Sequence, residues 1–401
     1  MILSFLKKNI SLPPAILIID IGATSVAGAI VRIEPNKKPD ILFTVRKEIQ
    51  TQHTITAASF LFAMNNALTL VLKIIHARRA AQPSHIFCTL SSPWFIIKDR
   101  DVQKTMPEVF KITPQSLEEC IDEDIEKLKD EEKKKLPYDD IQIIEKKIIR
   151  VHLDHCESTN PYGIMASHIA LKAMITISSK LVIKRISQTL GVFFHTPEVH
   201  FSAFPIAGFS IVRDMFPTEK NFLFLDITGE ATDVSLIGGD MLLKINSFPI
   251  GKNFFIRALS TELSTSYEEA TTLFRMFFSD TLHNSKRIMI EKIIQDTREK
   301  WCTQFKKIWS TFSKEGIVPH RIFFMSDPDI AIYFITLIDS IKEQIFTSRM
   351  GPVKYLDQKT LEKYVSIESS PFGDPFIITE VFFVMKILEQ KGKRETKNYK
   401  I

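Results

Sequence analysis

The stretch ILIIDIGATS at 16–25 decides the fold of this chain, because its pattern returns as FLFLDITGEATD at 222–233. In both copies an apolar strand runs into an aspartate and then into a turn of small residues. Small side chains let backbone N–H groups approach an anion, and the aspartate places a carboxylate where a hydrated Mg²⁺ can bind. The duplication therefore predicts two turns that face one phosphate chain.

The elements that follow each copy also repeat. Each copy supplies the first of three strands, and apolar residues at helical spacing come after the third strand. The first set continues with strands at 26–33 and 41–48 and a helix at 57–80; the second has strands at 222–226, 232–237 and 241–249 and helices from 252 onward. A repeated strand-strand-strand-helix unit predicts two similar α/β halves that face each other.

A segment of different character lies between the halves. Thr113 and Pro114 have the chemistry of a helix N-cap and first helical position, and they precede an apolar stripe at helical spacing made by Leu117, Ile121, Ile125 and Leu128. Strands are predicted at 85–90, 141–153 and 166–176, so the order is strand-helix-strand-strand. Helices at 179–190 and 201–213 then return the chain to the first half.

Composition and charge exclude several classes of protein. Hydrophobic residues make up 45% of the 401 residues and charged residues 25%, which is typical of a globular protein. The net charge of +5 comes largely from the basic tail at 391–401, which argues against a broad nucleic-acid-binding face. The 4 cysteines lack metal-ligand spacing and are predicted to be free thiols in a reducing cytoplasm.

No signal peptide or transmembrane helix is expected. The longest apolar runs are interrupted by a charge, at Asp20 near the N-terminus and at Glu380 and Lys386 near the C-terminus. The first residues, MILSFLKK, carry their basic residues on the wrong side for a signal peptide. The predicted localisation is cytoplasmic, with the inner face of the cell membrane as a further expectation.

The motifs and their order resemble the actin/Hsp70-type ATPase fold, and within it the bacterial branch that contains FtsA and PilM. Residues 20–26 look like the phosphate-1 loop of that family, and residues 226–233 look like its phosphate-2 loop. The segment at 84–177 lies where this branch carries its SHS2 domain. The implied fold class is α/β: a duplicated actin-like (ribonuclease H-like) ATPase fold with an inserted SHS2 (strand-helix-strand-strand) subdomain.

The resemblance also implies a division into domains. The expected parts are a flexible N-terminus at 1–13, the first half at 14–83, the SHS2 insert at 84–177, return helices of the first half at 178–215, the second half at 216–370, a closing helix on the first half at 371–390 and a basic tail at 391–401.

The cofactors implied by the resemblance are ATP and Mg²⁺. The positions that match the two phosphate loops, and would bind the cofactor, are Asp20, Gly22, Ala23, Thr24, Ser25, Asp226, Thr228, Gly229 and Glu230. Asp20 and Asp226 are the expected metal positions, acting through water. Asp226 and Glu230 are the candidates for catalysis, whereas Asp233 is expected to be structural.

Several positions depart from the family pattern, so a degenerate ATP site is expected. Glu230 replaces a glycine, and two unit charges about 4 Å apart repel by roughly 4 kcal/mol at an effective dielectric constant of about 20. Either Glu230 points away or triphosphate binding is weakened. Thr271 and Phe274 stand where relatives have an acid and a base for the nucleoside, and 326–329 (SDPD) replaces a pair of glycines.

The function implied by the resemblance is a cytoplasmic scaffold with at most weak ATPase activity. Expected partners are FtsZ-like division proteins or inner-membrane pilus assembly proteins, with self-association, peripheral membrane contact through the basic tail, and no nucleic acid. The absence of a C-terminal amphipathic helix favours the pilus role, while the turn at 160–163 (NPYG) and the chain length favour the division role. The alternatives are an active ATPase or phosphotransferase, and a structural protein whose insert is its sole interaction surface.

Overall fold

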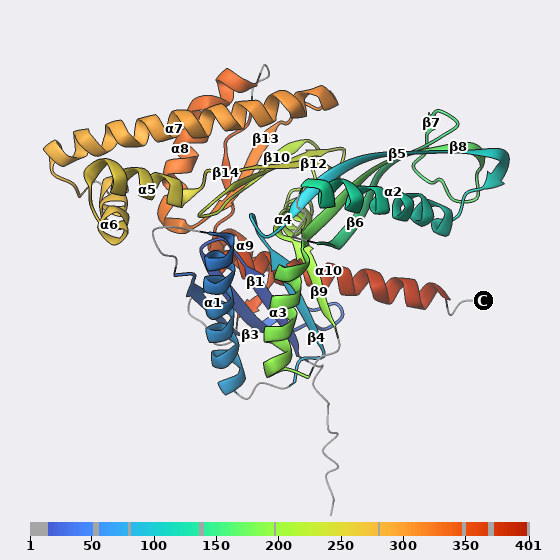
Figure 1. The fold of residues 1–401 in the computed structure, drawn as a ribbon, viewed down its shortest axis with the longest axis horizontal. Helices are drawn as coiled ribbons and strands as arrows, with labels where there is room; N and C mark the ends of the chain where they lie inside the picture. The colour runs from blue at the N-terminus through green and yellow to red at the C-terminus, as the bar shows by residue number, and fades with distance from the viewer. Residues whose placement is uncertain are drawn as a thin grey trace, which may run out of the picture.

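The computed structural model describes residues 15–50, 56–78, 82–135, 140–195, 198–279, 281–346, 350–367 and 373–398. Its strands form sheets of six, five and four strands. Figure 1 shows a lower part that contains α1, α3 and the first sheet, an upper left part that contains α5 to α8, and an arm to the right built from α2, β5, β6 and β8.

The six-stranded sheet has the order β15-β3-β2-β1-β4-β9. Its central strand, β1, contains the first copy of the repeated pattern; it runs antiparallel to β2 and parallel to β4. The strands are β1 (Ile16–Ile21), β2 (Ser25–Arg32), β3 (Asp40–Glu48), β4 (His85–Leu90), β9 (Val199–Ala203) and β15 (Ser366–Ile367).

The five-stranded sheet has the order β12-β11-β10-β13-β14 and repeats this plan. Its central strand, β10, contains the second copy, antiparallel to β11 and parallel to β13. The strands are β10 (Phe222–Ile227), β11 (Thr232–Gly238), β12 (Met241–Phe248), β13 (Arg321–Ser326) and β14 (Lys354–Tyr355). Asp20 and Asp226 are each the fifth residue of the matched strands, so the predicted duplication is confirmed at the level of strand pairing.

The four-stranded sheet belongs to the arm and has the order β5-β8-β6-β7. Helix α2 packs on it through the predicted apolar stripe, whose four side chains are at most 4% exposed. Thr113 and Ser116 exchange side-chain to backbone hydrogen bonds at the start of this helix, as a capping pair does. The elements are β5 (Ile96–Lys111), α2 (Pro114–Lys135), β6 (Ile141–Leu153), β7 (Cys156–Glu157) and β8 (Met165–Ser179).

The prediction that the strand at 85–90 opens the inserted sheet is wrong. That strand is β4, which pairs with β1 and β9 in the six-stranded sheet. The first strand of the inserted sheet is β5, which the sequence analysis missed. Charged residues occur throughout β5, and Val102 is its one buried side chain, so the apolar alternation that marks a strand is nearly absent. We therefore propose that the insert begins after β4 rather than at residue 84.

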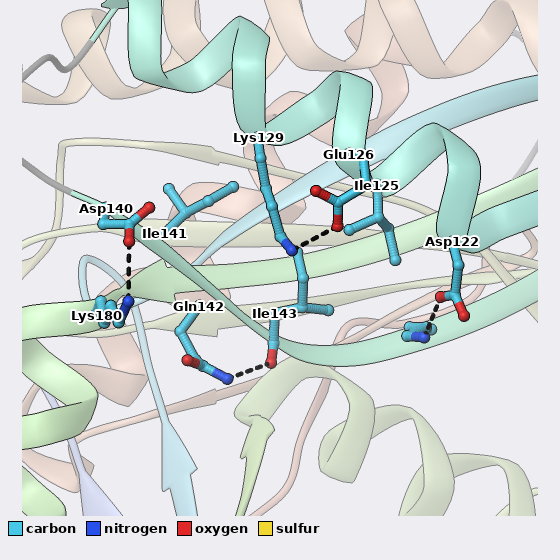
Figure 2. Close-up of a pocket in the computed structure, with 10 residues that line it drawn as sticks. Asp122, Ile125, Glu126, Lys129, Asp140, Ile141, Gln142, Ile143 and Lys180 are labelled. Atoms are coloured by element: carbon cyan, nitrogen blue, oxygen red, sulfur yellow. Dashed lines mark hydrogen bonds and ion pairs between the residues drawn. The ribbon is translucent and has the colours of Figure 1, made fainter.

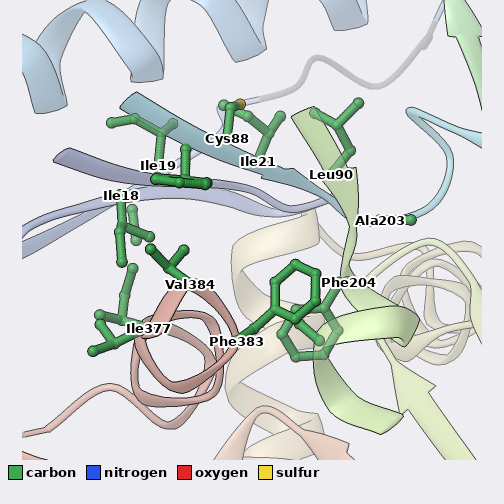
Figure 3. Close-up of a cluster of buried hydrophobic side chains, with 14 of the residues drawn as sticks. Ile18, Ile19, Ile21, Cys88, Leu90, Ala203, Phe204, Ile377, Phe383 and Val384 are labelled. Atoms are coloured by element: carbon green, nitrogen blue, oxygen red, sulfur yellow. The ribbon is translucent and has the colours of Figure 1, made fainter. Parts of the chain in front are cut away.

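Helices cover both faces of the six-stranded sheet. Figure 3 shows Ile19 and Ile21 of β1 on the side of α1, and Ile18 on the side of α10 with Ile377 and Val384. Gly28 of β2 allows the close approach of α1, since a Cβ atom there would lie 2.7 Å from Cδ1 of Ile75. The helices of this half are α1 (Ala57–Ala77), α3 (Lys180–Phe193), α4 (Phe204–Met215) and α10 (Pro375–Asn398).

The second half has its own core on the five-stranded sheet. Trp301 is fully buried, stacks on Phe305 with ring centroids 5.2 Å apart and donates from Nε1 to Oγ1 of Thr232. The remaining helices are α5 (Lys252–Leu263), α6 (Tyr267–Phe278), α7 (Asn284–Phe312), α8 (Pro328–Ile345) and α9 (Gln358–Leu361), with short 3₁₀ turns at Ser313–Glu315 and Glu362–Tyr364.

Two expectations concern the chain ends. The flexible N-terminus predicted at 1–13 lies outside the described residues. The closing helix predicted at 371–390 is α10, which packs on α4 and β1 and continues to Asn398, so part of the predicted tail is helical. Among the described residues, α1 alone has the length and hydropathy of a membrane-spanning helix, and its inner side is packed into the core of the first half.

Candidate functional site

The two small-residue turns meet at the junction of the halves, as the duplication predicted. A Cβ atom on Gly229 of the second turn would lie 1.9 Å from Cγ2 of Thr24 in the first turn. Position 229 must therefore be glycine if the turns are to pack this closely. The contact places Thr24 and Gly229 against each other with no intervening side chain.

The first turn is closed by its own hydrogen bonds. The N–H of Gly22 donates to the carbonyl of Ser25 at 3.0 Å. The indole Nε1 of Trp94 donates to the carbonyl of Gly22 at 2.8 Å, and Ala23 is buried. Trp94 comes from the segment between β4 and β5, so the turn is held from outside the repeat as well.

Asp20 is bound by an arginine that the sequence analysis did not identify. Arg46 of β3 donates from Nη2 to Oδ2 of Asp20 at 2.7 Å, from Nη1 to Oγ of Ser25 at 2.7 Å, and from Nε to Oδ2 of Asp374 at 2.6 Å. We call Asp20, Arg46 and Asp374 the Arg46 triad. The triad joins β1, β3 and the start of α10, and it places a fixed positive charge beside the carboxylate that the resemblance assigns to Mg²⁺.

Burial and charge act in opposite directions on Asp20. Asp20 is 2% exposed, and this burial raises the pKa of its carboxyl group to about 6. The charge of Arg46 lowers this pKa, and the charge of Asp374 raises it. Arg46 therefore stabilises the ionised form of Asp20 only in part, since it is shared with a second carboxylate.

Asp226, the matching residue of the second copy, has a different environment. It is 0% exposed, and neither carboxylate oxygen has a hydrogen-bond partner. Burial, followed by the nearby charges of Asp233, Asp20 and Asp327, raises the pKa of Asp226 well above its ordinary value. Burial beside other carboxyl groups therefore favours the protonated form of Asp226.

Asp233 connects the two halves. Its Oδ1 accepts a hydrogen bond from Oγ of Ser92 at 2.6 Å and another from Oγ of Ser247. Ser92 follows β4 of the first half, whereas Asp233 and Ser247 lie on β11 and β12 of the second. Burial raises the pKa of Asp233 to about 6 despite the hydroxyl donors. These contacts agree with the structural role expected for this residue.

The residues present do not fit a directly bound metal ion. No group of three or more His, Cys, Asp or Glu side chains among the described residues has the arrangement of a metal site. Asp20 is engaged by Arg46, and Asp226 is the one carboxylate of the pair without a hydrogen-bond partner. The expectation of Mg²⁺ at Asp20 and Asp226 therefore stays a prediction, restricted to contact through water.

Glu230 points toward α5. Its Oε1 accepts from Nδ2 of Asn253 at 2.7 Å and from Nη1 of Arg257 at 2.9 Å, and its Oε2 accepts from Nη2 of Arg257 at 2.8 Å. This two-point pair places a compensating charge beside Glu230. Of the two outcomes expected for Glu230, the structure thus favours the one in which the side chain points away.

The N-terminus of α5 is used within the second turn. The N–H groups of Lys252 and Asn253 donate to the carbonyls of Thr228 and Gly229 at 3.0 and 2.7 Å. Thr228 closes the turn, since its N–H donates to the carbonyl of Ala231 at 2.9 Å. Two of the N–H groups that a helix start would offer to an anion are therefore already engaged.

The region that replaces the glycine pair is also bound internally. Nζ of Lys252 contacts Asp329 at 2.7 Å and Asp327 at 3.3 Å. At the two positions that the resemblance matched to the nucleoside, Thr271 donates to the carbonyl of Tyr267, and Phe274 is 1% exposed and packs against Phe278. Thr271 thus contributes a hydrogen bond within α6, and Phe274 contributes to the core.

Two cavities lie at the arm rather than at the turns. One, of about 520 Å³, lies between α2 and the start of β6; Figure 2 shows Lys129 paired with Glu126 and Lys180 with Asp140 along its wall. The other, of about 510 Å³, lies between β6, α3 and β9, and we call it the β6–β9 groove. It is lined by Gln142, Ile143, Ile144, Ile183, Ser187, Leu190, Gly191, Glu198, Val199, His200 and Phe201.

Comparison with known proteins identifies the fold. No protein-family model matches the sequence, and no curated protein matches it. A chain of the PilM-PilN type IV pilus biogenesis complex is similar over 92% of this chain and 96% of its own length, with a TM-score of 0.61 and 14% identity. This similarity shows that the chain has the actin-like ATPase fold, which confirms that part of the predicted fold class.

Two further solved structures are similar over most of their length. MreB 5 of Spiroplasma citri, bound to AMPPNP, has a TM-score of 0.47 and 10% identity, and the match covers 96% of this chain and 98% of that one. The ethanolamine utilization protein EutJ of Carboxydothermus hydrogenoformans has a TM-score of 0.44 and 10% identity, with 93% and 90% coverage.

Proposed function

We propose that this chain is an actin-like scaffold of the PilM type, which binds protein partners at the cytoplasmic face of a membrane and does not depend on ATP hydrolysis. One observation carries the proposal: three basic side chains at the junction of the turns are each paired with carboxylates. Arg46 binds Asp20 and Asp374, Arg257 binds Glu230, and Lys252 binds Asp327 and Asp329.

These ion pairs oppose nucleotide binding, because separating them costs free energy. A triphosphate that recruited Arg46 would leave Asp20 and Asp374 as buried carboxylates without a cation. Removing one partner from a buried ion pair costs about 3–5 kcal/mol, and every 1.4 kcal/mol is about a tenfold change in affinity. Competition with the Arg46 triad alone would thus lower the affinity for a nucleotide by roughly two to four orders of magnitude.

A titration with fluorescent ATP, with and without Mg²⁺, tests the scaffold role. We expect no saturable binding in the micromolar range for the natural chain or for Asp20→Ala. Glu230→Gly restores the glycine of the second turn but leaves the Arg46 triad intact, so it is expected to remain without binding as well. Micromolar affinity that requires Mg²⁺ and disappears in Asp20→Ala would contradict the proposal and support an active nucleotide site.

The β6–β9 groove is the place where we propose that a partner segment binds. Strand β9 lies at the end of the six-stranded sheet, paired to β4 on one side. Strand β6 is paired along one edge to β8, and β7 pairs with its other edge at His152 and Leu153 within the described residues. Two sheet edges therefore border one groove, and an extended segment can add to such an edge by backbone hydrogen bonds.

The groove also offers apolar contacts from the helix beside it. Ile183 and Leu190 of α3 and Ile143 of β6 line it together with Ser187. At the far end, Oγ of Ser202 donates to Oε2 of Glu145 at 3.1 Å, so the two edges are joined there. A fixed groove with open edges suits an extended peptide better than a folded domain.

A bulky substitution in the groove tests this site. Ser187→Trp is expected to reduce the affinity for a PilN-type protein of the same organism at least tenfold in a pull-down or calorimetric titration, because the indole fills the space beside Leu190. Ser310→Trp, at an exposed position of α7, is the matched control and should bind normally. Equal binding by both variants would place the partner elsewhere.

A further inference from the structure

The two helices on the outer side of the six-stranded sheet contain no acidic residue. Neither α1 nor α3 has an Asp or Glu, whereas each of the other described helices of at least twelve residues has one or more. An outer helix of a globular protein ordinarily carries charges of both signs on its solvent side. The composition of these two helices therefore needs an explanation beyond the packing of the core.

Large apolar side chains project from both helices. Phe62 and Leu70 of α1 are 68% and 49% exposed, and Leu181 and Val192 of α3 are 54% and 78% exposed. The side chains that pack on the sheet belong to the opposite side of each helix, for example Met64 and Ile186. The four exposed residues thus contribute little to the core.

The charged side chains exposed on these two helices are basic. Lys73 of α1 and Lys184 and Arg185 of α3 are exposed. We call the surface formed by Phe62, Leu70, Lys73, Leu181, Lys184, Arg185 and Val192 the α1–α3 face. The helices pack side by side, and Oγ1 of Thr189 donates to Oδ1 of Asn65 at 2.6 Å between them, so the face is continuous (Figure 1).

We propose that the α1–α3 face lies on the surface of a bilayer that contains anionic lipid. Basic side chains and single projecting apolar side chains, without acids, are the composition of an interfacial membrane surface. The basic groups would bind lipid headgroups while Phe62, Leu70, Leu181 and Val192 enter the boundary of the acyl chains. These side chains project singly along two helices, an arrangement that suits a flat lipid surface better than the interlocking surface of a folded protein.

This placement goes beyond the proposed scaffold role and does not depend on it. The same helix α3 lines the β6–β9 groove with Ile183, Ser187 and Leu190. A partner segment that leaves the bilayer would therefore meet the groove beside the lipid-bound face. Lipid binding can fail while partner capture in the groove persists, so the two proposals are tested separately.

Vesicle co-sedimentation of the full chain tests the proposal. The natural chain should bind vesicles of phosphatidylcholine with phosphatidylglycerol and not vesicles of phosphatidylcholine alone. The double variant Lys184→Glu/Arg185→Glu should bind at least about 30-fold more weakly, because each basic residue near an anionic surface contributes about 1 kcal/mol. Lys306→Glu/Lys307→Glu, with the same charge change at exposed positions of α7, should bind within about twofold of the natural chain, because α7 lies in the second half, away from α1 and α3 (Figure 1).

The apolar part of the face has its own variant. At 1 M ionic strength the attraction between charges is screened over about 3 Å, so the vesicle binding that remains there depends on the apolar side chains. Phe62→Ser/Leu70→Ser should abolish this remaining binding. Circular dichroism checks that this variant is folded. Two results would overturn the proposal. Equal losses of vesicle binding in both charge-reversed variants would mean that net charge or the basic tail directs binding. No vesicle binding by the natural chain would assign the face to an acidic protein instead.

Discussion

Replacing Arg46 by alanine is expected to lower the free energy of unfolding by about 3–5 kcal/mol, the range for removing one partner from a buried ion pair. Asp20 and Asp374 would lose their shared cation, although the side chains of these residues are only 3% and 14% exposed. Arg46 is itself 30% exposed, so water partly replaces it and the lower end of the range is the better expectation. A single substitution of a partly exposed polar residue would thus be strongly destabilising.

Urea unfolding followed by circular dichroism measures this effect. Arg46→Lys should recover part of the loss, because it keeps the charge but cannot bind Asp20, Ser25 and Asp374 together. Lys38→Ala, at an exposed position before β3, is the control and should change stability by less than about 0.5 kcal/mol. A loss below about 1 kcal/mol in Arg46→Ala would show that the triad has little energetic weight.

Asp226→Asn is expected to stabilise the protein at neutral and higher pH. The pKa of Asp226 is raised by burial, so the folded state binds its proton more tightly than the unfolded chain does. Stability from such a group is present below the unfolded pKa of about 4 and is lost as the pH rises toward the folded pKa, by about 1.4 kcal/mol per pH unit. Asparagine is neutral at every pH and removes this dependence.

The pH dependence of stability has the same sign for two neighbouring carboxyl groups, those of Asp20 and Asp233. Burial raises the pKa values of Asp20 and Asp233 to about 6, so each contributes a loss of stability between about pH 4 and pH 6. The natural chain should therefore become less stable across this window as the pH rises, a trend opposite to that of ordinary paired carboxylates.

Unfolding curves at pH 4 to 8 check both statements. Asp226→Asn should show a flatter profile and be more stable than the natural chain at pH 8, because asparagine has no proton whose binding differs between the folded and unfolded states. Asp296→Asn, on the exposed side of α7, should reproduce the natural profile. A natural chain whose stability rises steadily from pH 5 to 8 would be inconsistent with buried, proton-binding carboxyls at the junction.

Much of the fold could be predicted from local patterns. The apolar strands before Asp20 and Asp226, and the stripe of α2, are marked by periodicity, and all were found where expected. Strand β5 was missed because it is a mostly exposed strand with charges on both faces. The partnership of β4 was misjudged because order along the chain does not state which neighbour a strand pairs with.

The candidate site could be predicted only in part. Sequence order identified Asp20, Asp226 and the two turns, and the departures at Glu230, Phe274 and 326–329. It did not identify Arg46, Arg257 or Lys252, since a basic residue in a strand or helix has the same local pattern whether it faces solvent or a carboxylate. Asp374, which shares Arg46 with Asp20, follows Arg46 by 328 positions along the chain.

The sequence by itself determined the two similar α/β halves, because strand and turn signals are local and occur twice. Only the tertiary structure decided which side chains pair with the charged residues at the two turns. Strands β1 and β3 and the start of α10 converge on Arg46, and this convergence places Asp20 in an internal ion pair. The physical reason is that a buried charge must be compensated by its nearest neighbours, and neighbours are set by packing rather than by position along the chain.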